Sequence, residues 1–185
     1  MHMIDYLQII NEYESLFGQN SSLKNLKTQI KNWENIIDRK NMNGHIVCSP
    51  FVFTTDFSKL LCIYHKTQQR YQQPWEHIDD MVSHPFVHGM RELEEETWLQ
   101  IARIHDRHLN NNLCPINIDS HIIPSRPEKN EWEHIHHDIQ FICIADETIV
   151  WTDDKGVNDA HRECIENLSD EMKQRVKIVK ERLWI

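Results

Sequence analysis

The sequence contains no uninterrupted apolar stretch of about 18 residues, so we expect no transmembrane helix and no membrane partner. No basic segment followed by an apolar one opens the chain, so we expect no signal peptide. Internal repeats and low-complexity tracts are also missing. These absences leave an ordinary globular chain, and 185 residues predict one domain.

Basic residues are fewer than acidic ones, and the formal net charge is −9. A non-specific nucleic-acid binder needs a basic surface, so nucleic-acid binding is not expected. A small phosphorylated ligand remains compatible with this charge, because a bound metal ion can supply positive charge locally.

Paired cysteine motifs are absent as well. The five cysteines are scattered, odd in number and form no CxxC pair: Cys48, Cys62, Cys114, Cys143 and Cys164. Three of them lie in apolar, strand-like runs, where cysteine behaves as a small hydrophobic residue. This usage predicts a reducing, cytoplasmic location and no disulfide framework.

The most informative segment that is present is the acidic run 91–99. Successive residues of a helix advance by about 100°, so Glu92, Glu95 and Glu96 fall within roughly 100° of one another. A separate face, which would pack on a core, collects Phe86, Met90, Leu93 and Thr97. Neighbouring carboxylates repel each other unless a cation such as Mg²⁺ lies among them. The alternative is a solvated acidic face, because glutamate is a good helix former.

The run reads Arg-Glu-hydrophobic-x-Glu-Glu-x, followed by Trp98. It resembles the second half of the Nudix box, in which glycine occupies the position of Trp98. Further segments, in the same order, resemble a group of small bacterial Nudix hydrolases: 44–49, 60–65, 73–79, 118–124 and 134–138. The resemblance covers roughly residues 44–182. The beginning of the pattern departs from the family, because Trp75 and Glu76 replace the paired glycines before the box and Ser83 stands in the place of the first box glutamate.

The resemblance implies a Nudix α/β/α sandwich, an α/β (α+β) fold in which helices flank a mixed β-sheet. The Nudix domain would span residues 41–185, and residues 1–40 would form a two-helix extension packed on the core or on a second subunit, which makes a homodimer possible. The implied function is hydrolysis of a nucleoside diphosphate linked to another moiety, dependent on Mg²⁺ or Mn²⁺. The departures in the box favour an alternative, a catalytically impaired protein that binds a nucleotide or a protein partner.

The resemblance also implies the site residues. Glu92, Glu95 and Glu96 would be metal ligands, joined by the backbone carbonyl of Trp75. Arg91 would orient a box glutamate through a charge-assisted hydrogen bond, so Arg91, Glu92 and Glu95 are the expected catalytic residues. Two further carboxylates could complete the site, Asp79 from the loop and Asp138 from a facing strand; the alternative for each is a surface or loop-capping acid.

The histidines at 134, 136 and 137 allow three interpretations. On a strand, His134 and His136 share one face and His137 points to the other. Without a nearby cysteine the spacing is a weak zinc signal. The remaining interpretations are a substrate-binding role, assigned to His136 and His137, and a purely structural role.

Residue periodicity and turn residues predict the elements. Helices are expected at 3–17, from Ser21 or Ser22 to about 39, at 84–97 with Ser83 as cap, and at 169–183. Strands are expected at 45–53, 59–65, 99–105, 135–145, 148–152 and 162–166. We expect mostly loop and edge strand over 106–131, and a polar loop over 153–159.

Overall fold

The computed structural model describes residues 4–65, 69–97, 103–127, 130–145 and 157–185. The helices are α1 (Tyr6–Phe17), α2 (Lys24–Lys31), α3 (Pro85–Thr97), α4 (Asp106–Leu109) and α5 (Asp170–Leu183), with short 3₁₀ turns η1 (Ser21–Leu23) and η3 (Ile165–Asn167). The strands are β1 (His45–Phe53), β2 (Lys59–His65), β3 (Arg70–Gln72), β4 (Glu76–His77), β5 (Arg103–Ile104), β6 (Asn117–Ile123), β7 (His134–Ile144) and β8 (Val157–Cys164). No helix in these ranges is both long and apolar enough to cross a membrane.

Strands β1 and β7 form the parallel centre of a mixed sheet, in register from His45 opposite His136 to Phe53 opposite Ile144. All other pairings among the described strands are antiparallel: β2 and β4 pair with β1, β5 and β6 with β7, and β3 and β8 with β2. Every residue of β1 is buried. A strand covered on both faces belongs in the middle of a sheet, which explains the central place of this apolar segment.

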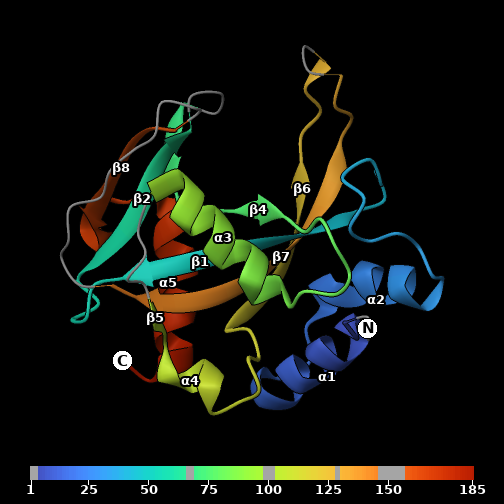
Figure 1. Ribbon diagram of the computed structural model, residues 1–185, viewed down its shortest axis with the longest axis horizontal. Coiled ribbons are helices and arrows are strands. Elements are labelled where there is room, and N and C mark those ends of the chain that lie inside the picture. The colour runs from blue at the N-terminus through green and yellow to red at the C-terminus, as the bar shows by residue number, and fades with distance from the viewer. Residues whose placement is uncertain (1–3, 66–68, 98–102, 128–129, 146–156) are drawn as a thin grey trace.

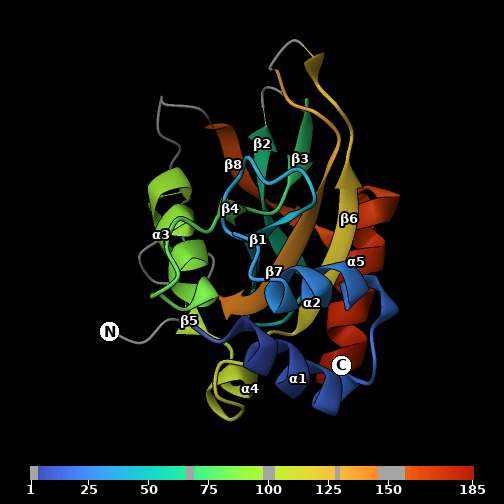
Figure 2. The same cartoon turned by 90° about the vertical axis from the view of Figure 1, so that its right-hand side faces the viewer.

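Helices cover both faces of the sheet, with α3 on one side and α5 on the other (Figures 1 and 2). Side chains alternate along β1, so Phe51 and Phe53 pack against Met172 and Val176 of α5. Val52, between them, joins a cluster with Leu93 of α3. This arrangement confirms the predicted mixed sheet between helical layers.

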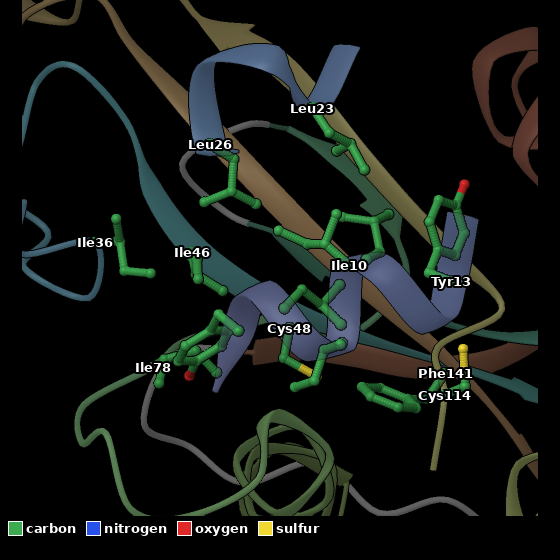
Figure 3. Packing of buried hydrophobic residues seen from close by; sticks show 14 residues of the cluster. Ile10, Tyr13, Leu23, Leu26, Ile36, Ile46, Cys48, Ile78, Cys114 and Phe141 are labelled. Carbon is green, nitrogen blue, oxygen red and sulfur yellow. The ribbon is translucent and has the colours of Figure 1, made fainter. Parts of the chain in front are cut away.

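The N-terminal helices share a core with the α3 side of the sheet (Figure 3). Ile10 and Tyr13 of α1 and Leu26 of α2 lie in one buried cluster with Cys48 of β1 and Phe141 of β7. The Tyr13 hydroxyl also donates to Asn117 Oδ1 at 3.2 Å. Helices α1 and α2 therefore cover apolar side chains of the sheet, and the domain boundary at residue 40 stays a prediction.

Several predicted elements agree with the structure. Strands β1 and β2 have the predicted bounds, and α3, β7 and α5 differ from the prediction by one residue at most at each end. Helix α1 begins at Tyr6 because Asp5 caps it and accepts from the Gln8 N–H at 3.0 Å. It ends at Gly18, which adopts a positive φ of 87°.

Helix α2 ends at Lys31, so the predicted extension to about residue 39 is wrong. Trp33 adopts φ 58°, while its N–H donates to the Ile30 carbonyl and the Glu34 N–H donates to the Gln29 carbonyl. These two bonds and the left-handed residue form a Schellman ending. Trp33 is consequently 89% exposed and does not belong to the apolar stripe that the spacing predicted.

Two other expectations need correction. The segment 106–131 holds the short helix α4 as well as β6, and β8 begins at Val157, so residues 157–159 belong to a strand and not to a polar loop. Only 103–104 of the predicted strand at 99–105 are strand among the described residues. The predicted strand at 148–152 and the box position Trp98 lie outside the described residues.

Candidate functional site

The loop before α3 is fixed by its own side chains. Asp80 Oδ1 accepts from the backbone N–H groups of Ser83 at 2.6 Å and Val82 at 2.7 Å, and these bonds lower the pKa of Asp80. The Phe86 N–H donates to His84 Nδ1 at 3.2 Å, so His84 takes the capping place that we expected for Ser83. Pro85 opens the helix, where its missing N–H costs nothing.

On α3, Glu92 and Glu95 lie apart from the buried residues that pack on the sheet. Leu93 and Thr97 are fully buried, Glu92 is partly buried and Glu95 is exposed. Gly89 lets the helix approach β1 closely, because a Cβ at this position would lie 2.7 Å from Cys48 Sγ. The side chain of Glu96 lies outside the described residues.

Arg91 binds the loop carboxylate of Asp79, where the resemblance implied a glutamate of the helix. Arg91 Nη2 donates to Asp79 Oδ2 at 3.0 Å. Partial burial alone would lower the pKa of Arg91, but the Asp79 carboxylate, followed by Glu95 and Glu76, raises it. The arginine therefore holds the end of the entry loop, which we define as residues 73–79, against the acidic helix.

Beside this pair lies the buried imidazole of His88, whose Nδ1 is 3.1 Å from Asp79 Oδ1. Its Nε2 is 3.8 Å from Asp80 Oδ2. Neither ring nitrogen makes a well-aligned hydrogen bond within the described part of the chain. Asp79, Asp80 and His88 form one of two groups of described side chains whose potential ligand atoms lie within 4.8 Å of one another. The second group is His45, His134 and His136.

On the α5 side of the sheet a pocket of about 370 Å³ opens between β1, β6, β7, α5 and the segment 70–75. Trp75 reaches it from the box-entry loop, and its ring lies 5.3 Å from the ring of His136. The entry loop of the acidic helix thus forms part of the pocket wall. Exposed Tyr71 and partly exposed His121 line the same pocket.

Asp138 is the buried carboxylate of this pocket. Its Oδ2 accepts from Gln140 Nε2 at 2.9 Å and lies 3.6 Å from Arg175 Nη1, while Oδ1 has no hydrogen-bond partner among the described residues. Burial raises the pKa of Asp138, although Arg175 opposes this shift. A buried acid with a raised pKa in a cleft is a candidate for function.

The structure places Asp138 away from the acidic helix. It shares the face of β7 that carries Ile142 and packs on α5, whereas α3 packs on the other face. The expectation that Asp138 joins the box glutamates as a metal ligand therefore does not match its position, and a role in the pocket fits better.

The neighbouring histidines also separate. His136 lines the pocket, but His137 is fully buried on the opposite face, so its expected place at the substrate does not match the structure. His137 Nε2 is 2.8 Å from Gln29 Oε1, and its Nδ1 is 2.8 Å from Ser120 Oγ. Burial, followed by nearby histidines, lowers the pKa of His137 to about 4. These contacts agree with the structural interpretation of His137.

Sequence reasoning missed His45, His77 and Arg175. His77 stands between Trp75 and the histidine group, with ring centres 5.3 Å from Trp75 and 5.1 Å from His45. Burial and the adjacent His45 lower its pKa to about 4. Strand pairing brings His45 and His77 to this place, and Arg175 reaches the pocket from α5, so the local sequence of each residue held no signal for the site.

Comparison with solved structures identifies the architecture. A Nudix-family hydrolase from Clostridium perfringens matches with a TM-score of 0.54 at 15% identity, over 76% of this chain and 98% of the other. The chain has the Nudix fold. The Nudix domain of NrtR from Shewanella oneidensis, solved with ADP ribose, matches with a TM-score of 0.50 at 14% identity, over 85% of this chain and 97% of the other. An Ap4A hydrolase from C. elegans matches with a TM-score of 0.56 at 11% identity, over 75% of this chain and 97% of the other. No protein family and no curated protein matches the chain in sequence.

Within the Nudix fold, the structure divides the predicted site residues into two groups. Arg91, Glu92 and Glu95 lie on the box helix, and Asp79 is tied to them through Arg91. A second group, on the pocket side of the sheet, comprises Trp75, His136 and Asp138. The entry loop 73–79 connects the two groups.

Proposed function

We propose that this chain is a Nudix-type hydrolase that cleaves a nucleoside diphosphate linked to another moiety, with the help of a divalent metal ion. One observation carries the proposal. The box helix turns its acidic face away from the core, and the loop that enters this helix also lines a pocket. One short loop therefore joins the acidic helix, which would bind the metal ion, to the pocket, which would bind the substrate.

The donor atoms present suit Mg²⁺ or Mn²⁺. Glu92 and Glu95 offer carboxylate oxygens on the accessible side of α3, Glu96 follows in the same helix, and the entry loop offers the carbonyl of Trp75. Hard divalent cations prefer such oxygen ligands. When bound, the metal would neutralise the diphosphate and polarise its phosphorus. Arg91 has the separate task of holding Asp79, which keeps the entry loop against the helix.

The pocket offers contacts for the rest of a nucleotide. Tyr71 and Trp75 present aromatic rings on which a base could stack, and Arg175 and His121 contribute nitrogen donors. Two of the similar structures are an Ap4A hydrolase and a domain bound to ADP ribose, and both of these small molecules are nucleotides. They support the substrate class and leave the individual substrate open.

The direct test is a screen of nucleoside diphosphate derivatives, including ADP-ribose and Ap4A, with Mg²⁺ or Mn²⁺ and detection of released monophosphate. We expect metal-dependent turnover that falls by about 10²-fold or more in a Glu92→Gln, Glu95→Gln variant, since misplaced catalytic groups alone cost this much. Glu94→Gln is the control, because it removes one carboxylate from the same helix at an exposed position outside the arc. Turnover that is independent of metal, or equal losses in both variants, would contradict the proposal.

The alternative, a nucleotide binder with impaired catalysis, is favoured by the first half of the box. Ser83 supplies no carboxylate there, and Trp75 and Glu76 occupy the glycine positions of the phosphate loop. We therefore expect weaker turnover than a full box gives. Restoring glycine at positions 75, 76 and 98 together with glutamate at 83 should raise it. Calorimetric nucleotide binding without turnover, in both the natural and the restored chain, would support the binder.

A further inference from the structure

A second group of potential metal ligands lies apart from the box helix, where strands β1 and β7 begin. His45 and His136 are paired across the two parallel strands, and His134 lies two residues before His136. Their ring centres are 4.8 to 5.0 Å apart in all three pairs. All three imidazoles are buried, and their potential ligand atoms lie within 4.8 Å of one another.

The outer nitrogens of two rings are already oriented. His134 Nδ1 lies 2.8 Å from the carbonyl oxygen of Trp132, and His45 Nδ1 lies 3.3 Å from that of Asn41. A carbonyl only accepts hydrogen bonds, so each Nδ1 carries the hydrogen, and the Nε2 of each neutral ring carries a lone pair. Metal-bound histidines typically donate their second N–H to a backbone carbonyl in this way.

The Nε2 atoms of His134 and His136 face one another. His134 Nε2 is 3.2 Å from His136 Nε2, and the buried Nε2 of His45 has no hydrogen-bond partner among the described residues. Zinc–nitrogen bonds of about 2.0–2.1 Å in a tetrahedron place two ligand nitrogens roughly 3.3 Å apart. The spacing of His134 and His136 agrees with this value. Because His134 Nε2 carries a lone pair, His136 Nε2 donates the hydrogen bond between them, and a bound cation would replace this hydrogen and also satisfy the Nε2 lone pair of His45.

We propose that His45, His134 and His136 bind one divalent transition-metal ion of the zinc class. Imidazole suits zinc and its neighbours, whereas Mg²⁺ prefers oxygen, so the group should discriminate against the metal of the box helix. Three histidines with an open fourth position form a known zinc arrangement, that of carbonic anhydrase. The inference goes beyond the proposed function, because its ligands are independent of the box glutamates.

The histidine group lies next to the pocket and the entry loop. His136 and Trp75 line the pocket, and His77 of the entry loop lies 5.1 Å from His45 and 5.5 Å from His136 between ring centres. A metal ion here would join the starts of β1 and β7 beside the loop that leads to the box helix. Its fourth coordination position would be available to water or to a ligand.

The test uses the full chain without an affinity tag, stripped by a chelator and titrated with Zn²⁺ against a chromophoric competitor. We expect one Zn²⁺ per chain and a loss of affinity of about 10²-fold or more in His134→Gln and in His136→Gln, because even second-shell changes cost 10- to 100-fold. His121→Gln is the matched control, since its ring lies 6.0 Å from His136 but outside the group. The Glu92→Gln, Glu95→Gln variant separates this site from the box and should keep its affinity for Zn²⁺.

Absence of Zn²⁺ binding by the natural chain, or unchanged affinity in both ligand variants, would overturn the proposal. Circular dichroism of the stripped variants shows whether they fold. If they do not, ¹⁵N NMR of the histidines in the natural chain decides the question. Zn²⁺ should shift Nε2 of three rings and leave the Nδ1 hydrogens of His45 and His134 in place, and shifts at fewer rings or at other histidines would refute the assignment.

Discussion

Replacing Arg175 with methionine should destabilise the protein strongly near neutral pH and only weakly in acid. The Asp138 side chain is 2% exposed and the Arg175 side chain 18% exposed, and their charged atoms are 3.6 Å apart. Removing one member of a buried ion pair costs about 3–5 kcal/mol, because the other charge stays buried without compensation. Since Gln140 still donates to Asp138, we expect the lower end, about 3 kcal/mol.

The pH dependence follows from the direction of the pKa shift. Burial raises the pKa of Asp138 above its ordinary value of 3.8, and Arg175 lowers it, so loss of Arg175 should raise it further. A carboxyl group whose pKa is higher in the folded state favours folding below its unfolded pKa, and this contribution disappears as pH rises through the folded pKa. The cost of Arg175→Met should therefore be small at about pH 4 and complete at about pH 8.

Urea unfolding at both pH values measures this difference, and a double-mutant cycle with Asp138→Asn isolates the pair. The double variant should recover most of the lost free energy of unfolding at about pH 8, because no charge remains buried. Glu171→Gln is the control, since Glu171 also pairs with Arg175 at 3.1 Å but is 53% exposed, and it should cost less than about 1 kcal/mol. Equal losses at the two pH values, or no recovery in the double variant, would refute this reasoning.

Three further predictions concern the core. Leu93→Ala should lower the free energy of unfolding by about 2–5 kcal/mol in a urea titration, because the side chain is fully buried between α3 and the sheet. Gly89→Ala should cost about 1–3 kcal/mol by the same measurement, because its Cβ would lie 2.7 Å from Cys48 Sγ and 3.3 Å from Pro50 Cδ. Under native conditions an alkylating reagent should modify Cys164 first, as mass spectrometry can establish, because the other four thiols are buried and burial raises the pKa of each; rapid modification of Cys48 would contradict the packing.

Local patterns predict the fold where they agree with the packing. The run from His45 to Phe53 is strand-forming and flanked by turn residues, and the structure gives it the predicted bounds. The predicted helix from Ser21 is too long, because its apolar spacing continues past Trp33, where the backbone turns and the helix has ended. A left-handed residue other than glycine leaves no mark in the periodicity, so the spacing alone could not predict this ending.

Within the candidate site, local spacing could relate only the residues of the helix to one another. Glu92 and Glu95 share a face because they share a helix, and a fixed angular step relates them. His45 and His136 meet because two distant strands pair in one register, which no spacing within either segment encodes. Likewise, the resemblance placed Asp138 near the box, and only the alternation of side chains along β7 shows that it faces α5.

The parallel pairing of β1 and β7 has a consequence for how the chain folds. The two central strands come from opposite halves of the sequence, and no short hairpin can join parallel neighbours. The chain must close a long loop before this contact contributes any stability, and such topologies fold slowly. During synthesis, β1 and β2 leave the ribosome well before β7, so the apolar strand that becomes the middle of the sheet is at first an unprotected edge. The nascent chain is therefore most exposed to aggregation until residue 144 has emerged.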